Sequence, residues 1–132
     1  MKTEELAAWV SDARSRTLET YADLADSALQ VPYLETINPP LWEMGHVAWF
    51  QEYWILRKLL GGESRLPNSD ERWNSALVPH VSRWGLALPS RRETVEQLEI
   101  VRDRVLDALN RSGSPMDDRL RYFTMLSVFH ED

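Results

Sequence analysis

The sequence predicts an all-α protein, a four-helix bundle with one long crossover between its second and third helices. Apolar residues recur every three or four positions in four separate segments, which is the spacing of one helix face. We find no segment with the alternating apolar and polar pattern of a strand. The long segment from Gly62 to Pro89 separates the second pair of helices from the first, and it allows helices two and three to run parallel.

The first helix is expected over residues 3–29. Its apolar face begins at Leu6 and Val10 and continues with spacings of three and four. Thr3 is expected to cap the first turn, where two glutamates complement the helix dipole. Pro32 follows the last periodic position, and proline cannot continue a helix, so the helix is expected to end before it.

The second helix is expected to begin in the segment "NPPLW", at residues 38–42, and to end at Gly61-Gly62. Asn38 is a favourable N-cap, and proline suits a first turn whose backbone N–H groups need no helical partner. Glycine is the usual residue after a helix, because it adopts the left-handed conformation without strain.

The third helix is expected to follow Ser90, because "SRRE" is a capping box in which Ser90 and Glu93 satisfy each other's backbone donors. The segment 112–115 is expected to close this helix and open the fourth, with Ser114 as N-cap and Pro115 in the first turn. The apolar stripe of the third helix comprises Thr94, Leu98, Val101, Val105 and Leu109.

Composition excludes several classes of function. The chain has 132 residues, enough for one domain with one core. Lys and Arg number 15 against 21 for Asp and Glu, a net charge of −6 that argues against nucleic-acid binding. The absence of cysteine excludes disulfides and thiolate metal sites. We find no signal peptide and no apolar run of about 20 residues, so no membrane span and a cytoplasmic protein are expected.

Two histidines make a metal site the candidate functional centre. His46 on the second helix and His130 on the fourth both lie in apolar, core-facing stripes, so their imidazoles are expected to meet in the bundle core. Neutral imidazole is the commonest metal ligand, and it needs an acceptor to fix its tautomer. The neighbours on the two stripes are Trp42, Phe50 and Tyr53, and Phe123 and Leu126. The carboxylates expected as partners or ligands are Glu43, Glu52, Glu131 and Asp132.

The residues alone leave a structural role open for both histidines. A single histidine on an apolar helix face is more often a hydrogen-bonded core residue than a ligand. A catalytic metal usually has three protein ligands, and His80 in the crossover is the candidate for the third, although an exposed loop histidine is the simpler interpretation. The arginines and tryptophans of the crossover are expected to anchor this loop on the bundle: Arg72, Trp73, Arg83 and Trp84.

Four motifs resemble one known family. They are "PPLWEMGHVAWFQEYW" in the second helix, "ERWNSALVPHVSRWGLALPS" in the crossover, "RRETVEQL" opening the third helix and "YFTMLSVFHED" in the fourth. Together they resemble the DinB-like N-terminal domain of the ergothioneine sulfoxide synthases and their relatives, the selenoneine synthases. The last three motifs resemble those of the selenoneine branch. The resemblance covers the chain from Pro39 onward, and the first helix more loosely.

The resemblance implies a non-haem Fe(II) site with three histidine ligands. His46 matches the histidine of the family's W-x-x-x-H segment, which begins at Trp42. His130 matches the first member of an H-x-x-x-H pair, and residues four apart share a helix face. The third histidine would fall beyond Asp132, so the sequence is expected to end inside the family's last helix. Glu131 is a further candidate ligand.

The family's activity is the oxygen-dependent formation of a carbon–sulfur or carbon–selenium bond on hercynine, with a thiol or a seleno-sugar as donor. Its second domain, which resembles formylglycine-generating enzymes, completes the substrate pocket. We therefore expect this chain alone to be inactive, to bind metal weakly or not at all, and to form a homodimer or higher oligomer through uncovered apolar surface. The alternatives are a structural or interaction bundle without metal, and a stand-alone DinB-like thiol-dependent transferase.

Overall fold

The computed structural model describes residues 2–29, 31–66, 68–112 and 117–132, and within these ranges all regular secondary structure is helical. The four long helical segments and the short helices between them, in chain order, are α1 (Thr3–Ala22), the 3₁₀ helix η1 (Asp26–Leu29), α2 (Pro40–Gln51), its π-helical continuation η2 (Glu52–Leu59), α3 (Ser69–Trp73), the 3₁₀ helix η3 (His80–Trp84), α4 (Arg91–Arg111) and α5 (Asp118–Glu131).

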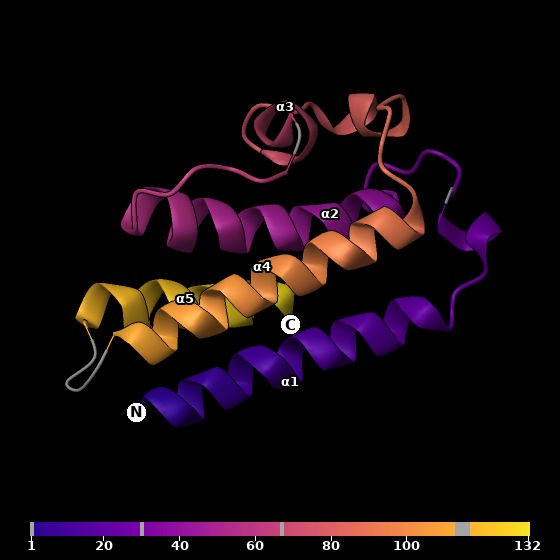
Figure 1. The fold of residues 1–132 in the computed structure, drawn as a ribbon. Helices are drawn as coiled ribbons and strands as arrows, with labels where there is room; N and C mark the ends of the chain where they lie inside the picture. The colour runs from indigo at the N-terminus through magenta and orange to yellow at the C-terminus, as the bar shows by residue number, and fades with distance from the viewer. Residues whose placement is uncertain (1, 30, 67, 113–116) are drawn as a thin grey trace.

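The helices form the expected bundle with one long crossover. Figure 1 shows α1 and α5 running in one direction and α2 and α4 in the other, so α2 and α4 are parallel. Helices α1 and α2 each contact both α4 and α5, which gives a four-sided arrangement. The crossover between α2 and α4 folds over the outer side of α2 and carries α3 and η3 (Figure 1). The predicted fold class is confirmed.

The core is built where the apolar stripes of the helices meet. All five stripe residues predicted for the third helix are buried in α4, from Thr94 to Leu109. Leu6 and Val10 of α1 are equally buried and belong to the same core cluster. This periodic pattern is a local property of the chain, and the structure follows it closely.

Helix ends differ from expectation at α1. The helix ends at Ala22, and the chain turns before the separate 3₁₀ helix η1. Asp23 and Asp26 lie at this end, where aspartate has low helix propensity and its charge opposes the helix dipole. Thr3 is the first helical residue instead of the cap, and Lys2 occupies the N-cap position without a side-chain hydrogen bond.

The expected cap of α2 is also different, because Pro39 occupies the N-cap position. Asn38 uses its side chain elsewhere: its amide donates to the Glu43 carboxylate, and its carbonyl accepts from Arg83 at 2.8 Å. The helix continues through η2 and stops at Gly61, whose φ of 73° is left-handed, as the sequence predicts.

The two remaining helix starts are capped by side chains. The Ser90 capping box of α4 is confirmed, with both reciprocal hydrogen bonds present. At α5, Asp117 is the N-cap, and its carboxylate accepts from the backbone N–H groups of Arg119 at 2.8 Å and Leu120 at 3.1 Å. The predicted cap Ser114 and the predicted first-turn Pro115 lie outside the described residues.

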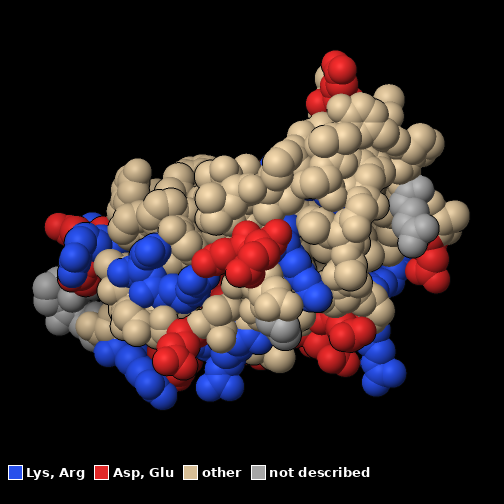
Figure 2. Space-filling model, turned by 90° about the horizontal axis from the view of Figure 1, so that it is seen from above, with Lys and Arg blue, Asp and Glu red and all other residues tan. Residues whose placement is uncertain are grey.

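Charged side chains of both signs lie on the surface. Figure 2 shows acidic and basic side chains interspersed over one part of the displayed face and a broad uncharged area over the rest. Within the residues that the structure describes, no helix is long and apolar enough to cross a membrane.

Candidate metal centre

The structure brings His46 and His130 together. His46 lies in the middle of α2 and His130 in the last turn of α5, 84 positions later in the chain. Their Nε2 atoms are 3.2 Å apart. Because α2 and α5 pack side by side, this meeting of two imidazoles from different helices is produced by the bundle itself.

His46 is buried between two tryptophans. Its ring stacks on Trp42 at 4.6 Å and on Trp49 at 5.5 Å between centroids, and 7% of the residue is exposed. Its Nδ1 lies 2.7 Å from the backbone carbonyl oxygen of Trp73. Since a carbonyl can only accept, Nδ1 carries the hydrogen, and the lone pair of Nε2 faces His130.

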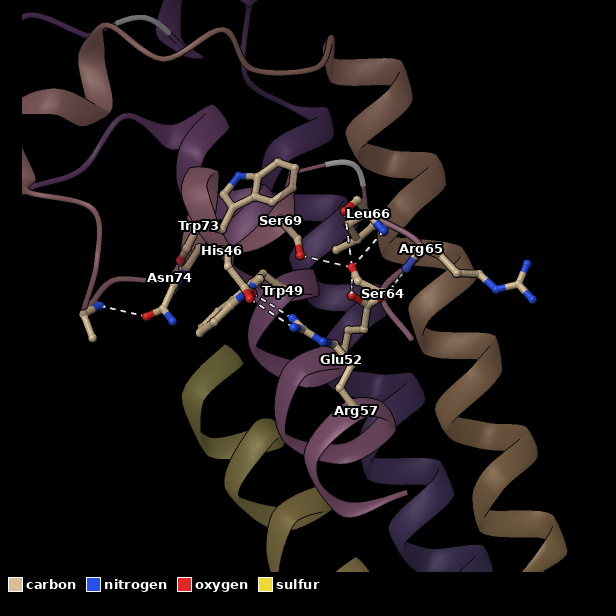
Figure 3. Close-up of polar contacts among 12 residues, drawn as sticks. His46, Trp49, Glu52, Arg57, Ser64, Arg65, Leu66, Ser69, Trp73 and Asn74 are labelled. Carbon is tan, nitrogen blue, oxygen red and sulfur yellow. Dashed lines mark hydrogen bonds and ion pairs between the residues drawn. The ribbon is translucent and has the colours of Figure 1, made fainter. Parts of the chain in front are cut away.

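The acceptor comes from the crossover. Trp73 is the last residue of α3, where helix carbonyls have no partner within the helix. The neighbouring carbonyl of Arg72 accepts from the Trp42 indole N–H at 2.6 Å. Figure 3 shows His46, Trp49 and Trp73 close together at this junction between α2 and the crossover. The sequence suggested a carboxylate in this role, and the structure provides a backbone carbonyl instead.

His130 lies at the edge of the core. The helix α5 buries Leu120, Thr124, Ser127 and Val128, whereas Phe123 and Leu126 are half-buried and His130 is largely exposed. The predicted core-facing stripe is therefore rotated toward the boundary of the bundle. The His130 ring nevertheless stacks on Phe50 at 3.7 Å between centroids, with an interplanar angle of 5°.

Both imidazoles are held in the neutral form at pH 7. Desolvation, and then repulsion from His46, lowers the pKa of His130 to about 4. Burial also lowers the pKa of His46, and this effect outweighs the hydrogen bond to Trp73, which raises it. Neutral imidazole is the form that binds metal ions.

The spacing of the two nitrogens fits one metal ion. Metal–nitrogen bonds are about 2.1 Å long, so two nitrogens 3.2 Å apart could both bind the same ion. Within ranges 2–29, 31–66, 68–112 and 117–132, however, no group of three or more His, Cys, Asp or Glu side chains converges. The described residues therefore bring two imidazole nitrogens together without a third candidate ligand beside them.

Glu131 and Asp132, the carboxylates next to His130, bind arginines of α1. Glu131 accepts from Arg14 Nε at 2.8 Å and from the Thr17 hydroxyl at 2.8 Å, and its side chain is 2% exposed. Asp132 pairs with Arg16 at 2.8 Å. In this arrangement Glu131 holds the end of α5 against α1 rather than facing the two imidazoles.

The carboxylates on α2 and η2 are also occupied by other groups. Glu43 accepts from the amide of Asn38. Glu52 is fully buried and accepts from the Ser64 hydroxyl at 2.6 Å, and it pairs with Arg104 at 3.4 Å. It anchors the start of the crossover, as Figure 3 shows for its contact with Ser64.

His80 anchors the crossover to the segment before α2. The Nε2 atom of this half-buried residue lies 2.8 Å from the Leu34 carbonyl, and its ring packs against Tyr33 and Trp84. The expectation of an exposed loop histidine is therefore corrected. Arg83 lies 4.1 Å from the ring centroid of Trp42, so the expected anchoring role of the crossover residues is confirmed.

Sequence reasoning missed Arg14, which is completely buried at the centre of the bundle. It donates to Glu131 of α5, to the side chain of Gln51 of α2 at 2.8 Å, and to the backbone carbonyl of Leu98 in α4. One side chain thereby joins all four long helices. The sequence could have indicated this burial, because Arg14 follows Val10 by four positions and so lies on the apolar face of α1.

Comparison with known proteins identifies the superfamily of this chain. Residues 4–130 match the DinB superfamily, so the chain belongs to this superfamily of helical bundles. Among curated proteins, it is 34% identical over 118 residues to a hercynine oxygenase of Mycolicibacterium thermoresistibile, a match that covers 86% of this chain and 26% of that enzyme. It is 30% identical over 131 residues to a hercynine oxygenase of Mycobacterium tuberculosis, which covers 98% of this chain and 30% of that enzyme.

These matches confirm the resemblance to the DinB-like domain of the ergothioneine sulfoxide synthase family. The chain spans between 26% and 30% of the length of these two relatives.

Proposed function

We propose that this chain is the metal-ligand domain of an oxygen-dependent, non-haem iron enzyme that acts on hercynine. The observation that carries the proposal is the pair of facing Nε2 atoms of His46 and His130, 3.2 Å apart in a DinB bundle. The similarity to two hercynine oxygenases supports the substrate. The reaction would join sulfur or selenium to the imidazole ring of hercynine, with a thiol or a seleno-sugar as donor, and the crossover motif favours the selenoneine branch.

In this proposal the chain supplies ligands and their surroundings. Fe(II), when bound, would contribute the activation of oxygen and of a soft sulfur or selenium donor. His46 and His130 would hold it through Nε2, and the Trp73 carbonyl would keep the His46 hydrogen on Nδ1. Trp42 and Trp49 stack on the buried His46 ring, and Phe50 stacks on the His130 ring. A third histidine beyond Asp132 and a second domain would complete the site.

The proposal is tested by metal binding. Titration of the 132-residue chain with Co(II) under anaerobic conditions is expected to show weak binding with a d–d spectrum. His46→Gln and His130→Gln should each abolish that binding, because each removes one of two facing donors. His80→Gln is the matched control and should leave it unchanged, since His80 bonds to Leu34. Retained Co(II) binding in His46→Gln would refute the proposed ligand set.

Activity provides a second test. We expect no turnover of hercynine by the 132-residue chain with iron, oxygen and either donor, because the matched enzymes use far more sequence. Robust turnover by this chain alone would contradict the assignment of a ligand domain.

A structural bundle without metal is the second candidate, and one observation favours it. The hydrogen-bonding groups of His46 can be satisfied within the protein, because Nδ1 meets Trp73 and Nε2 can accept from His130. Under this interpretation His46→Gln leaves metal content unchanged but lowers stability. Comparing metal content and unfolding free energy for the same variant separates the two functions.

Self-association of the chain stays a prediction. Tyr122 and Phe129 of α5 are 61% and 64% exposed, and large exposed apolar side chains favour association. Sedimentation velocity over a range of protein concentrations measures it. We expect a dimer or higher oligomer, and a strictly monomeric species at the highest concentration would contradict the prediction.

A further inference from the structure

We propose that α3 is a positioning element for His46 and that Asp70 is the positioning residue that anchors it. In this role α3 presents a backbone carbonyl to His46 Nδ1 and thereby keeps the Nε2 lone pair available. The consequence for metal affinity rests on the proposed function, whereas the consequence for the His46 tautomer does not.

Three ring N–H groups on one face of α2 all donate to α3. Trp42, His46 and Trp49 are spaced by four and three residues and so form one stripe. Trp42 donates to the Arg72 carbonyl at 2.6 Å, and His46 donates to the Trp73 carbonyl at 2.7 Å.

The third donor reaches a side chain of α3. The indole N–H of Trp49 donates to Oδ1 of Asp70 at 2.9 Å. Trp42 and His46, four residues apart on α2, therefore donate to the carbonyls of two successive residues at the end of α3. Trp49 donates to Asp70 in the first turn of α3. A helix of five residues is marginal on its own in water, so these contacts hold it in place.

Asp70 is the strongest of these anchors because it also binds Arg57 of η2. Arg57 Nη1 donates to Oδ1 at 2.7 Å and Nη2 to Oδ2 at 3.0 Å, a two-bond fork between planar groups. The Arg57 hydrogen bond, with help from Trp49, holds the pKa of Asp70 at about 2, so the carboxylate stays ionised in the physiological range. Figure 3 shows Arg57 and Trp49 on the same side of α2 as His46.

Gly45 sets how closely α3 can approach. A Cβ atom at this position would lie 2.2 Å from Nε1 and 2.5 Å from Cε2 of the Trp73 indole. Trp73 is 1% exposed, so its ring has little room to move away. The absence of a side chain at Gly45 therefore permits the contact that places the Trp73 carbonyl on His46.

The contact with α3 matters because the tautomer of His46 determines whether a metal ion can bind at Nε2. With hydrogen on Nδ1, the Nε2 lone pair faces His130 and a metal can bind there. With hydrogen on Nε2, that position is blocked until the proton is lost or moves. Groups that fix a ligating histidine in this way typically account for about 10- to 100-fold in metal affinity.

Two variants test the proposal: Asp70→Asn, which removes the charged fork, and Gly45→Ala, which displaces the Trp73 indole. Asp107→Asn is the matched control, because it breaks an exposed ion pair with Arg111 on α4, away from α3. Val105→Ala controls for lost stability, since it creates a cavity in the bundle core at α4, away from the contacts of α3 described above.

The readout is the tautomer of His46, followed by ¹⁵N chemical shifts of labelled histidine in the metal-free protein above pH 7. The starting protein and both controls should show hydrogen on Nδ1. Asp70→Asn and Gly45→Ala should show a mixture of tautomers and about 10- to 100-fold weaker Co(II) binding.

The outcomes separate the two claims. If both variants fold and His46 keeps its hydrogen on Nδ1, the positioning role of α3 is overturned. If Val105→Ala produces the same mixture, the effect reflects general destabilisation and the role is likewise overturned. If the tautomer shifts as expected but the starting protein binds no Co(II), the positioning role stands and the proposed function fails.

Discussion

Replacing Arg14 by methionine should destabilise the bundle strongly. Arg14 is completely buried, and its ion pair with Glu131 leaves the two side chains 0% and 2% exposed. Methionine fills much of the same volume without charge, so the change removes hydrogen bonds and the ion pair rather than packing. It also leaves the side-chain carbonyl of Gln51 without its 2.8 Å donor.

The expected cost follows from these contacts. Removing one partner of a buried ion pair typically costs about 3–5 kcal/mol, and orphaning a buried acceptor costs about 1–3 kcal/mol. Glu131 lies in the last turn of α5 and can turn toward solvent, which relieves part of the penalty. We therefore expect about 3 kcal/mol of lost unfolding free energy for Arg14→Met.

The double variant isolates the pair itself. Replacing both partners of a buried ion pair by apolar residues is often close to neutral, so Arg14→Met combined with Glu131→Met should cost no more than either single change. The resulting coupling energy should be about 2 kcal/mol or more, within the range measured for residues in one network.

Equilibrium urea unfolding, followed by far-UV circular dichroism and tryptophan fluorescence, measures these values. The denaturant slope must stay constant for the free energies to be compared. Arg111→Gln is the matched control, because its pair with Asp107 lies within α4 and is largely exposed, so its loss should leave the midpoint unchanged. A loss below about 1 kcal/mol for Arg14→Met, or additive single changes, would refute the assigned role of this network.

Three further predictions concern local features. Ser90→Ala should cost about 1 kcal/mol in urea unfolding, because it removes the capping box of α4, and a negligible effect would contradict that assignment. Gly61→Ala should cost about 1 kcal/mol by the same assay, since its φ of 73° is strained for alanine while no atom lies within 4 Å of the added Cβ. Asp70, whose pKa falls from 3.8 to about 2 on folding, should contribute stability that is fully present above about pH 4 and is lost as pH falls through 2. The difference in unfolding free energy between the starting protein and Asp70→Asn should therefore shrink from pH 6 to pH 2, and a constant difference would exclude this linkage.

Much of the fold was predictable because it depends on local pattern. The stripe from Thr94 to Leu109, the capping box at Ser90 and the stop at Gly61 are properties of a few neighbouring residues. Apolar periodicity and backbone preference act over one to five turns of helix, so the sequence indicates them directly. The end of α1 at Ala22 was missed, because the apolar pattern continues through the separate helix η1.

The candidate site was predictable only in part. Periodicity placed His46 and His130 on helix faces, and the family resemblance suggested one shared centre. The actual orientation of His130, at the boundary of the bundle and stacked on Phe50, depends on how α5 rotates against α2. That rotation is set by packing among four helices, which no single helix pattern specifies.

The sequence by itself determined the helices, the apolar stripes and the presence of one imidazole on each of two helix faces. The tertiary structure decided which groups pair with one another: the Trp73 carbonyl with His46, Arg14 with Glu131, and Asp70 with Arg57. The reason is physical. Helix formation depends on residues within a few positions, whereas these hydrogen bonds join residues 27 and 117 positions apart and form only when the helices pack.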